Sequence, residues 1–330
     1  MQIARRFCSA SAAIALLTVF PSGSRADHPR VHLFPELHAG DSLRYAVRFV
    51  TTKKIITKSN VAVPMAPENS KIESSGLLQI GVLETSRSET HSSYLLRAYF
   101  ISLDDGTVAK PFGSENQKPD VLTTTAAEKV LDFKITSDGT LAQVKGLDEL
   151  SPEQLQAWQI WIARFSLLWT LPGNGLRLGE KWKSEDAEKS PSPIRGLAWQ
   201  RETSYVRDEP CKPARLNSEG QIVASDFPEE KCAVLLSTAT LKQTSSHKDA
   251  TPEDYKLHDL KTMGSAAGTN QTITYISLKT GLVLRATEEA KQALDVTVST
   301  VDGSNQVHYH LDADSNSETQ LVSSSPQIHP

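Results

Sequence analysis

The chain has 330 residues, of which 38% are hydrophobic and 22% are charged, and its formal net charge is -4 at pH 7. A chain of this length forms one large domain or two ordinary ones and can bury a substantial core. The acidic balance, with no long run of lysine and arginine, disfavours nucleic acid as a partner because a phosphate backbone repels such a surface.

Residues 1–26 have the layout of a secretory signal peptide. Two arginines give a positive start, residues 8–20 are apolar or small, and Ser24-Arg25-Ala26 offers a small-residue cleavage site. The apolar part is shorter than the ~20 residues that span a bilayer, so an uncleaved anchor is the weaker alternative. We expect cleavage after Ala26, a periplasmic or secreted location, and no transmembrane segment in the mature chain.

Residues 27–150 are predicted to form an N-terminal β half that begins with an extended leader at 27–39. Leu43, Tyr45, Val47 and Phe49 alternate with more polar residues, which is the period of a strand with one apolar face. Similar signals follow at 54–63, 76–84, 93–102 and 131–135. Asp138-Gly139 then supplies a hairpin turn, because glycine accepts the positive φ that such turns need.

Residues 151–172 are predicted to be a connecting helix. Ser151-Pro152 is a typical helix start, and apolar residues then recur at three- and four-residue spacing. The stripe includes the side chains that we select as candidate ligand-binding residues: Trp158, Trp161, Phe165 and Trp169. Two readings stay open here, since these aromatic side chains either line an apolar pocket against a curved sheet or fill the core.

Residues 173–311 are predicted to form a C-terminal β half, and residues 312–330 a disordered tail. Strand signals lie near 198–207, 220–226, 232–241, 254–262, 270–278, 281–288, 292–300 and 305–311, with a clear hairpin turn at residues 278–281. The tail is rich in serine, aspartate and proline and poor in apolar residues, a composition typical of disorder.

A short motif, L-x-x-G-[DE]-x-apolar, occurs once in each half, around Gly40 and around Gly179. A second glycine follows each copy, and the distance from Gly40 to Gly139 nearly equals the distance from Gly179 to Gly281. Each second glycine comes six residues after an aromatic residue, Phe133 or Tyr275. The matching spacing suggests an internal duplication. The predicted fold class is therefore mainly β, with two antiparallel, curved sheet halves and one Trp-rich amphipathic helix between them.

Cys211 and Cys232 are the two cysteines that remain after signal cleavage. In an oxidising compartment their number and spacing favour one disulfide. Closing a loop of this size stabilises a fold by about 3 kcal/mol on the chain-entropy model. The alternative is a pair of free thiols, while the spacing argues against a redox-active C-x-x-C pair.

Motifs that carry catalytic or cofactor chemistry are not apparent. The sequence has no G-x-S-x-G nucleophile elbow and no phosphate-binding loop. The glycines at 173–179 resemble a dinucleotide-binding motif, but they follow a predicted helix where that motif follows a strand. No cofactor is therefore expected. His308, His310 and Asp312 share one strand face and have a spacing that could hold zinc. Because Val307, Tyr309 and Leu311 form the apolar face, we expect the two histidines and Asp312 to point to solvent, and no metal is assigned.

The mature chain resembles a group of exported bacterial proteins of unknown function. The likeness rests on the strand opening Gly179-Glu180-Lys181-Trp182, on the aromatic-before-glycine hairpins of both halves, and on the helix between them. More distantly, an antiparallel sheet around an apolar helix is similar in architecture to the half-barrels of outer-membrane lipoprotein carriers, which implies an apolar cavity.

These features favour a non-enzymatic binding or carrier module for an apolar or polymeric ligand of the cell envelope. The partner would be a lipid, another apolar ligand or an envelope protein. Two alternatives stay open: an extracytoplasmic hydrolase with a dispersed active site, and a structural or protein-interaction module.

Overall fold

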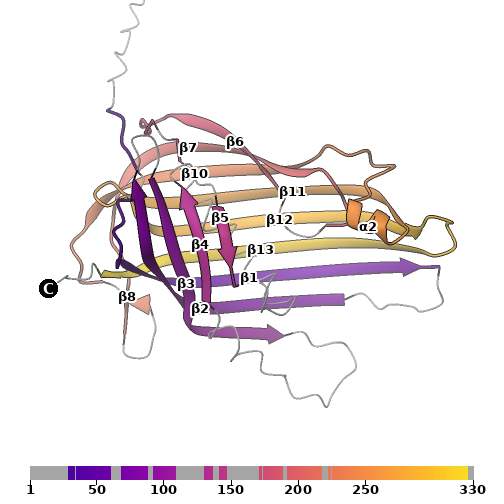
Figure 1. Cartoon of the computed structure of the whole chain (residues 1–330), viewed down its shortest axis with the longest axis horizontal. Helices are drawn as coiled ribbons and strands as arrows, with labels where there is room; N and C mark the ends of the chain where they lie inside the picture. The colour runs from indigo at the N-terminus through magenta and orange to yellow at the C-terminus, as the bar shows by residue number, and fades with distance from the viewer. Residues whose placement is uncertain are drawn as a thin grey trace, which may run out of the picture.

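The computed structural model describes residues 29–33, 35–60, 68–87, 92–108, 130–136, 141–146, 171–172, 174–188, 192–217, 222–223 and 225–325. These residues form one large antiparallel sheet of 11 strands and a separate two-stranded ribbon. The one helix among them is the short α2 (Glu253–Leu257) at the far end of the long strands (Figure 1). The fold is therefore mainly β, as the alternating patterns predict.

The large sheet has the strand order β5-β4-β3-β2-β1-β13-β12-β11-β10-β7-β6. Its N-terminal strands are β1 (Ser42–Ser59), β2 (Glu68–Arg87), β3 (Ser92–Val108), β4 (Val130–Thr136) and β5 (Leu141–Lys145). Its C-terminal strands are β6 (Lys181–Ala187), β7 (Leu197–Cys211), β10 (Glu230–Gln243), β11 (Leu260–Ser277), β12 (Val283–Thr300) and β13 (Gln306–Ser325). The ribbon consists of β8 (Arg215–Leu216) and β9 (Ile222–Val223).

Each half of the chain contributes one continuous block of strands, and β1 pairs with β13 to join the blocks. The result is one sheet with β5 and β6 at its two edges, so two separate sheet halves are not confirmed. The connecting helix predicted at 151–172 falls almost wholly outside the described residues. Only residues 171–172 of it are described, and neither is in a helix.

The predicted disorder of residues 312–330 is wrong for residues 312–325, which lie in β13. This strand pairs with β1 on one side and β12 on the other, so its backbone N–H and C=O groups are hydrogen-bonded despite the polar composition. A strand expected at 254–262 is also corrected, because its first part is α2 and only its end belongs to β11.

The two copies of the L-x-x-G-[DE] motif fold into the same turn. Gly40 and Gly179 both have positive φ, 91° and 82°. The Asp41 carboxylate accepts a hydrogen bond from the His38 amide at 2.7 Å, and the Glu180 carboxylate accepts one from the Arg177 amide at 2.8 Å. The Gly40 N–H donates to the Val82 carbonyl on β2, and the Val82 N–H donates to the Asp41 carbonyl. Gly179 and Glu180 make the same two backbone hydrogen bonds with Tyr205 on β7. The motif is thus a strand-opening turn in both halves.

Alternate side chains define an inner and an outer face of the sheet. On the inner face of the N-terminal strands, Tyr45, Leu78, Leu96 and Phe133 are almost completely buried. The leader continues this core, since Leu33 and Leu37 are buried and the Tyr94 hydroxyl donates to the Pro35 carbonyl. The inner face is therefore where the core lies and where a bound molecule would be shielded from water.

Candidate functional site

The strand register places three rows of mostly small or polar side chains across the middle of the inner face. Residues paired across antiparallel strands point to the same face, so the rows can be followed from β7 to β1. The first row is Trp199, Leu241, Gly268, Gln292, Ala313 and Lys53; the second is Arg201, Ala239, Asn270, Ala290, Ser315 and Thr51; the third is Thr203, Ser237, Thr272, Glu288, Ser317 and Phe49. We call these residues the central rows.

Apolar clusters lie on both sides of the central rows. The cluster next to the third row contains Leu33, Leu176, Tyr205, Ala233, Leu235, Ile276, Val283 and Ala286. The other cluster includes Leu241 and Trp199 of the first row itself and extends beyond that row to Ile194, Leu197, Ala250, Val296, Ala266, Leu294, Val298 and Tyr309. The inner face of the C-terminal strands is therefore apolar at both ends and polar in the middle.

Hydroxyl pairs organise the central rows. Thr51 Oγ1 and Ser315 Oγ lie 2.8 Å apart, and so do Thr203 Oγ1 and Ser237 Oγ. Thr51 and Thr203 are buried, and each pair leaves lone pairs on its oxygens for a further donor. The threonine and serine side chains are short, so at these positions they project only a little above the backbone of the sheet.

Trp199 is fixed at one end of the first row. Its indole Nε1–H donates to Glu188 Oε2 at 2.6 Å, and the Gln292 amide donates to the same oxygen at 3.4 Å. A Cβ atom on Gly268 would lie 2.9 Å from Trp199 Cη2, so the ring rests over this glycine. The row thus combines an oriented aromatic ring with a carboxylate and an amide.

Lys53, Arg201 and Glu288 bring charge to the inner face, and all three are half-buried. The carboxyl groups with shifted pKa values lie elsewhere, on the outer face, in turns or in α2: Glu73, Asp132, Glu180, Asp249, Glu253, Asp295 and Asp302. In every case hydrogen bonds to the charged form lower the pKa, most strongly from Arg48 to Glu73, whose pKa falls to about 2. These seven groups are ionised at neutral pH and act as partners in ion pairs and turns.

The candidate ligand-binding residues Trp158, Trp161, Phe165 and Trp169 lie outside the described residues, so their role stays a prediction. The central rows were not found from the sequence. Their signal was present in β13, where small residues alternate with acidic residues or asparagine from Asp312 to Glu318, but the polar composition of this segment favoured a prediction of disorder.

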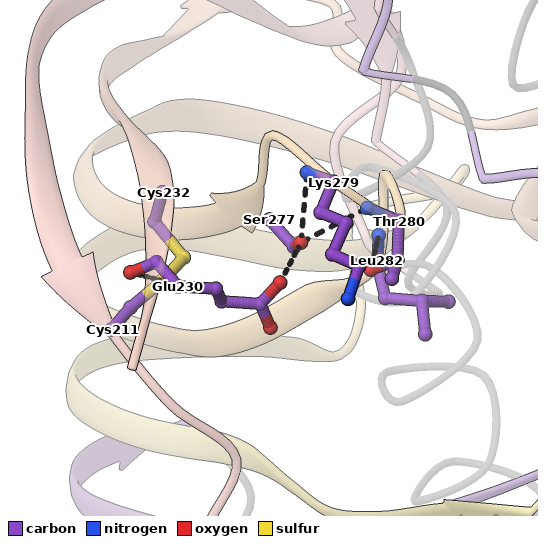
Figure 2. The surroundings of a disulfide bond; sticks show 7 residues. All are labelled: Cys211, Glu230, Cys232, Ser277, Lys279, Thr280 and Leu282. Atoms are coloured by element: carbon purple, nitrogen blue, oxygen red, sulfur yellow. Dashed lines mark hydrogen bonds between the residues drawn. A yellow bond between two sulfur atoms is a disulfide. The ribbon is translucent and has the colours of Figure 1, made fainter. Parts of the chain in front are cut away.

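The disulfide between Cys211 and Cys232 is confirmed, with an S–S distance of 2.05 Å. It joins the ends of β7 and β10 beside the β11–β12 hairpin, as Figure 2 shows. There the buried Ser277 hydroxyl donates to Glu230 Oε2 at 2.5 Å and accepts from the Lys279 and Thr280 amides. The disulfide and this serine together tie the hairpin to the strand ends.

His308 and His310 point to the outer face, as the alternation predicts. Their side chains are 36% and 37% exposed, and both contact the Asp295 carboxylate, at 3.0 and 3.4 Å. Within the described ranges, no three His, Cys, Asp or Glu side chains are arranged to hold a metal ion. The described residues also contain no helix with the length and apolar character needed to cross a membrane.

No family model matches the chain, and no curated protein matches it. Among solved structures, the chain is similar to a Bacteroides fragilis protein described as exported and as having a YmcC-like fold, with 9% identity and a TM-score of 0.27 over 90% of this chain and 100% of that one. It is also similar to the CymD monoaromatic hydrocarbon channel, with 11% identity and a TM-score of 0.12 over 86% of this chain and 89% of that one. The chain is similar as well to the Pseudomonas putida toluene transporter TodX, with 10% identity and a TM-score of 0.10 over 86% of this chain and 90% of that one.

The sequence was expected to resemble exported β-rich proteins, and the first of these structures is described as an exported protein. TM-scores this low carry no argument about a shared ligand or activity.

Proposed function

We propose that this protein is a non-enzymatic binding or carrier module of the cell envelope, and that its ligand is an amphiphile such as a lipid. The observation that carries the proposal is the pattern of the inner face, with the central rows between two apolar clusters. Apolar parts of a ligand would contact the clusters, while its polar groups would bond to hydroxyls and amides of the central rows.

Burial of the central rows supports this reading. Ala290, Ser315 and Asn270 are half-buried, whereas the alternate residues Asp314 and Asn316 on the outer face are exposed. Small side chains leave room above a sheet for a ligand, and a polar group bound there needs nearby donors and acceptors. In the second row, Ala239, Ala290 and Ser315 are small, and Asn270 and Thr51 supply donors and acceptors, which supports the proposal.

The aromatic side chains of the predicted helix have a defined place in this proposal. Trp158, Trp161, Phe165 and Trp169 would add aromatic surface to the same ligand site. An extracytoplasmic location is supported by the signal-like residues 1–26 and by the Cys211–Cys232 disulfide, since disulfides persist in oxidising compartments.

The test is native mass spectrometry of the mature protein purified from its own envelope, followed by lipid extraction. We expect a co-purifying lipid in the wild-type protein and its loss in Ala290→Arg, which places a long cation in the second row. The matched control is Ala267→Arg on the exposed outer face of β11, which should keep the lipid.

A Trp161→Ala variant extends the same experiment to the predicted helix. Loss of the lipid in a variant that still folds would support a role for the tryptophans. A wild-type protein with no bound lipid, or equal loss in Ala290→Arg and Ala267→Arg, would contradict the proposed function.

A further inference from the structure

The outer face of the N-terminal strands carries a group of cations that contrasts with the acidic chain. Arg44 on β1, Arg97 on β3, Lys134 on β4 and Lys145 on β5 all point to this face, opposite the buried inner residues. Asp132 lies between them, paired across strands with Arg97 and with Lys145, and Glu84 on β2 is exposed on the same face, so the four cations face two carboxylates. The local balance is therefore positive, although the formal net charge of the chain is -4.

A shallow hollow of about 340 Å³ opens in the middle of this group. It is lined by Arg97, Val130, Asp132, Lys145 and Gly146. Arg97 donates to both carboxylate oxygens of Asp132, at 2.8 and 2.9 Å, and these bonds hold the guanidinium at the hollow's edge. Asp132 balances one cation only, so an anion entering the hollow would meet a net positive charge from Arg97 and Lys145.

Exposed apolar side chains surround the same cations. Leu83 on β2, Ile101 on β3 and Val130 on β4 are 37%, 45% and 42% exposed. Tyr99 lies half-buried between them on the outer face of β3. Large apolar side chains left in water next to lysine and arginine are the pattern of a surface that contacts a membrane interface. We call this set of cations and apolar side chains the outer patch.

We propose that the outer patch docks on an anionic lipid surface, with a headgroup phosphate in the hollow beside Arg97 and Lys145. Leu83, Ile101 and Val130 then enter the interfacial layer, while Arg44 and Lys134 face neighbouring headgroups. Charge complementarity selects this occupant, because a net positive patch on an acidic protein is attracted to anionic lipid and not to neutral lipid. The inference concerns the outer face alone and does not depend on a ligand at the central rows.

The experiment is flotation of the full mature protein with vesicles of two compositions. One contains equal parts of phosphatidylglycerol and phosphatidylcholine, and the other contains phosphatidylcholine alone. We expect binding to the first, loss of that binding at high salt, and little binding to the second. Binding to neither composition, or equal binding to both, would overturn the inference.

The matched variants are Lys134→Glu/Lys145→Glu in the outer patch and Lys242→Glu/Lys261→Glu on exposed positions of β10 and β11. Both pairs change the net charge equally. Each cation near an anionic surface contributes about a five-fold factor, so the first pair should weaken binding at least ~25-fold. The second pair should keep most of the binding, and an equal loss in both pairs would also overturn the inference. Circular dichroism of every variant confirms that the sheet is intact.

Discussion

Gly264 shows how closely two strands approach at a single residue. Its φ is 151°, and a Cβ atom there would lie 2.1 Å from the Asp295 carbonyl oxygen and 2.8 Å from Val296 Cα on β12. Backbone atoms cannot move aside as a flexible side chain can. We expect Gly264→Ala to lower the free energy of unfolding by about 2–4 kcal/mol, measured by urea denaturation.

Gly303 provides the control for this substitution. Its φ is also positive, at 74°, but a Cβ atom would meet nothing within 4 Å. Gly303→Ala should therefore show only the backbone cost of the left-handed region, about 1 kcal/mol. Equal destabilisation by the two substitutions would show that the contact with β12 has no effect.

Glu73 makes a pH-dependent contribution to stability. Hydrogen bonds from Arg48 and Lys71, at 2.7 and 2.9 Å, lower its pKa from 4.5 to about 2. A lowered pKa in the folded state stabilises the fold above about pH 4.5, and this stabilisation is lost as the pH falls towards 2. Glu73→Gln should thus be less stable than wild type at pH 7.

The urea midpoints of the same two proteins should approach each other near pH 2, where Glu73 is protonated in the unfolded chain and about half protonated in the folded one. Because these side chains are exposed, the difference at pH 7 should be small and should shrink at high salt. A difference that persists unchanged at pH 2 would rule out the ion pairs as its cause.

Residue-level predictions from the sequence succeeded where local chemistry decides the outcome. Cys211 and Cys232 form the expected disulfide, and His308 and His310 lie on the solvent face that alternation predicts. Trp199 was missed, because its role depends on Gly268 and Gln292, which come from distant strands.

At the scale of elements, most of β13 was not predicted as a strand because its composition is polar. Few of its residues are apolar, and the sheet supplies its order through backbone hydrogen bonds to β1 and β12. Ala313 lies in the middle of this strand. We expect Ala313→Pro to lower the free energy of unfolding by ~3 kcal/mol or more, because proline removes a backbone donor from a strand paired on both sides.

Ala313→Ser is the conservative control and should change stability little, since serine keeps the backbone N–H and already occurs at inner-face positions of β13. Thermal unfolding followed by circular dichroism compares the two variants. Tolerance of proline at this position would mean that residues 312–325 are not a central strand.

The disulfide stabilises the strand ends of β7 and β10. Its sequence separation is 21 residues, for which the chain-entropy model gives about 3 kcal/mol. The double variant Cys211→Ser/Cys232→Ser should have a free energy of unfolding about 3 kcal/mol lower than that of the oxidised wild type, measured by urea denaturation. Reduced wild type should match the variant, and a variant as stable as the oxidised protein would contradict the entropic role.

At the scale of the whole molecule, the sequence predicted a β-rich chain with equivalent strand-opening turns at Gly40 and Gly179, and both are present. The joining of the two blocks was not predictable. It depends on pairing between β1 and β13, the first and the last strands in sequence order, and no local periodicity predicts such a contact. This pairing extends the central rows onto β1 and brings Thr51 to Ser315.

The most direct test of a ligand site on the inner face is thiol labelling of neighbouring residues on β12. Ala290→Cys places a thiol in the central rows, and Glu289→Cys places one on the exposed outer face. The native cysteines are joined in the disulfide, so a small maleimide reports only the new thiol. We expect Glu289→Cys to react equally in intact envelopes and in delipidated protein, and Ala290→Cys to be protected in envelopes and to react after delipidation. Equal reactivity of Ala290→Cys before and after delipidation would contradict a removable ligand on the inner face.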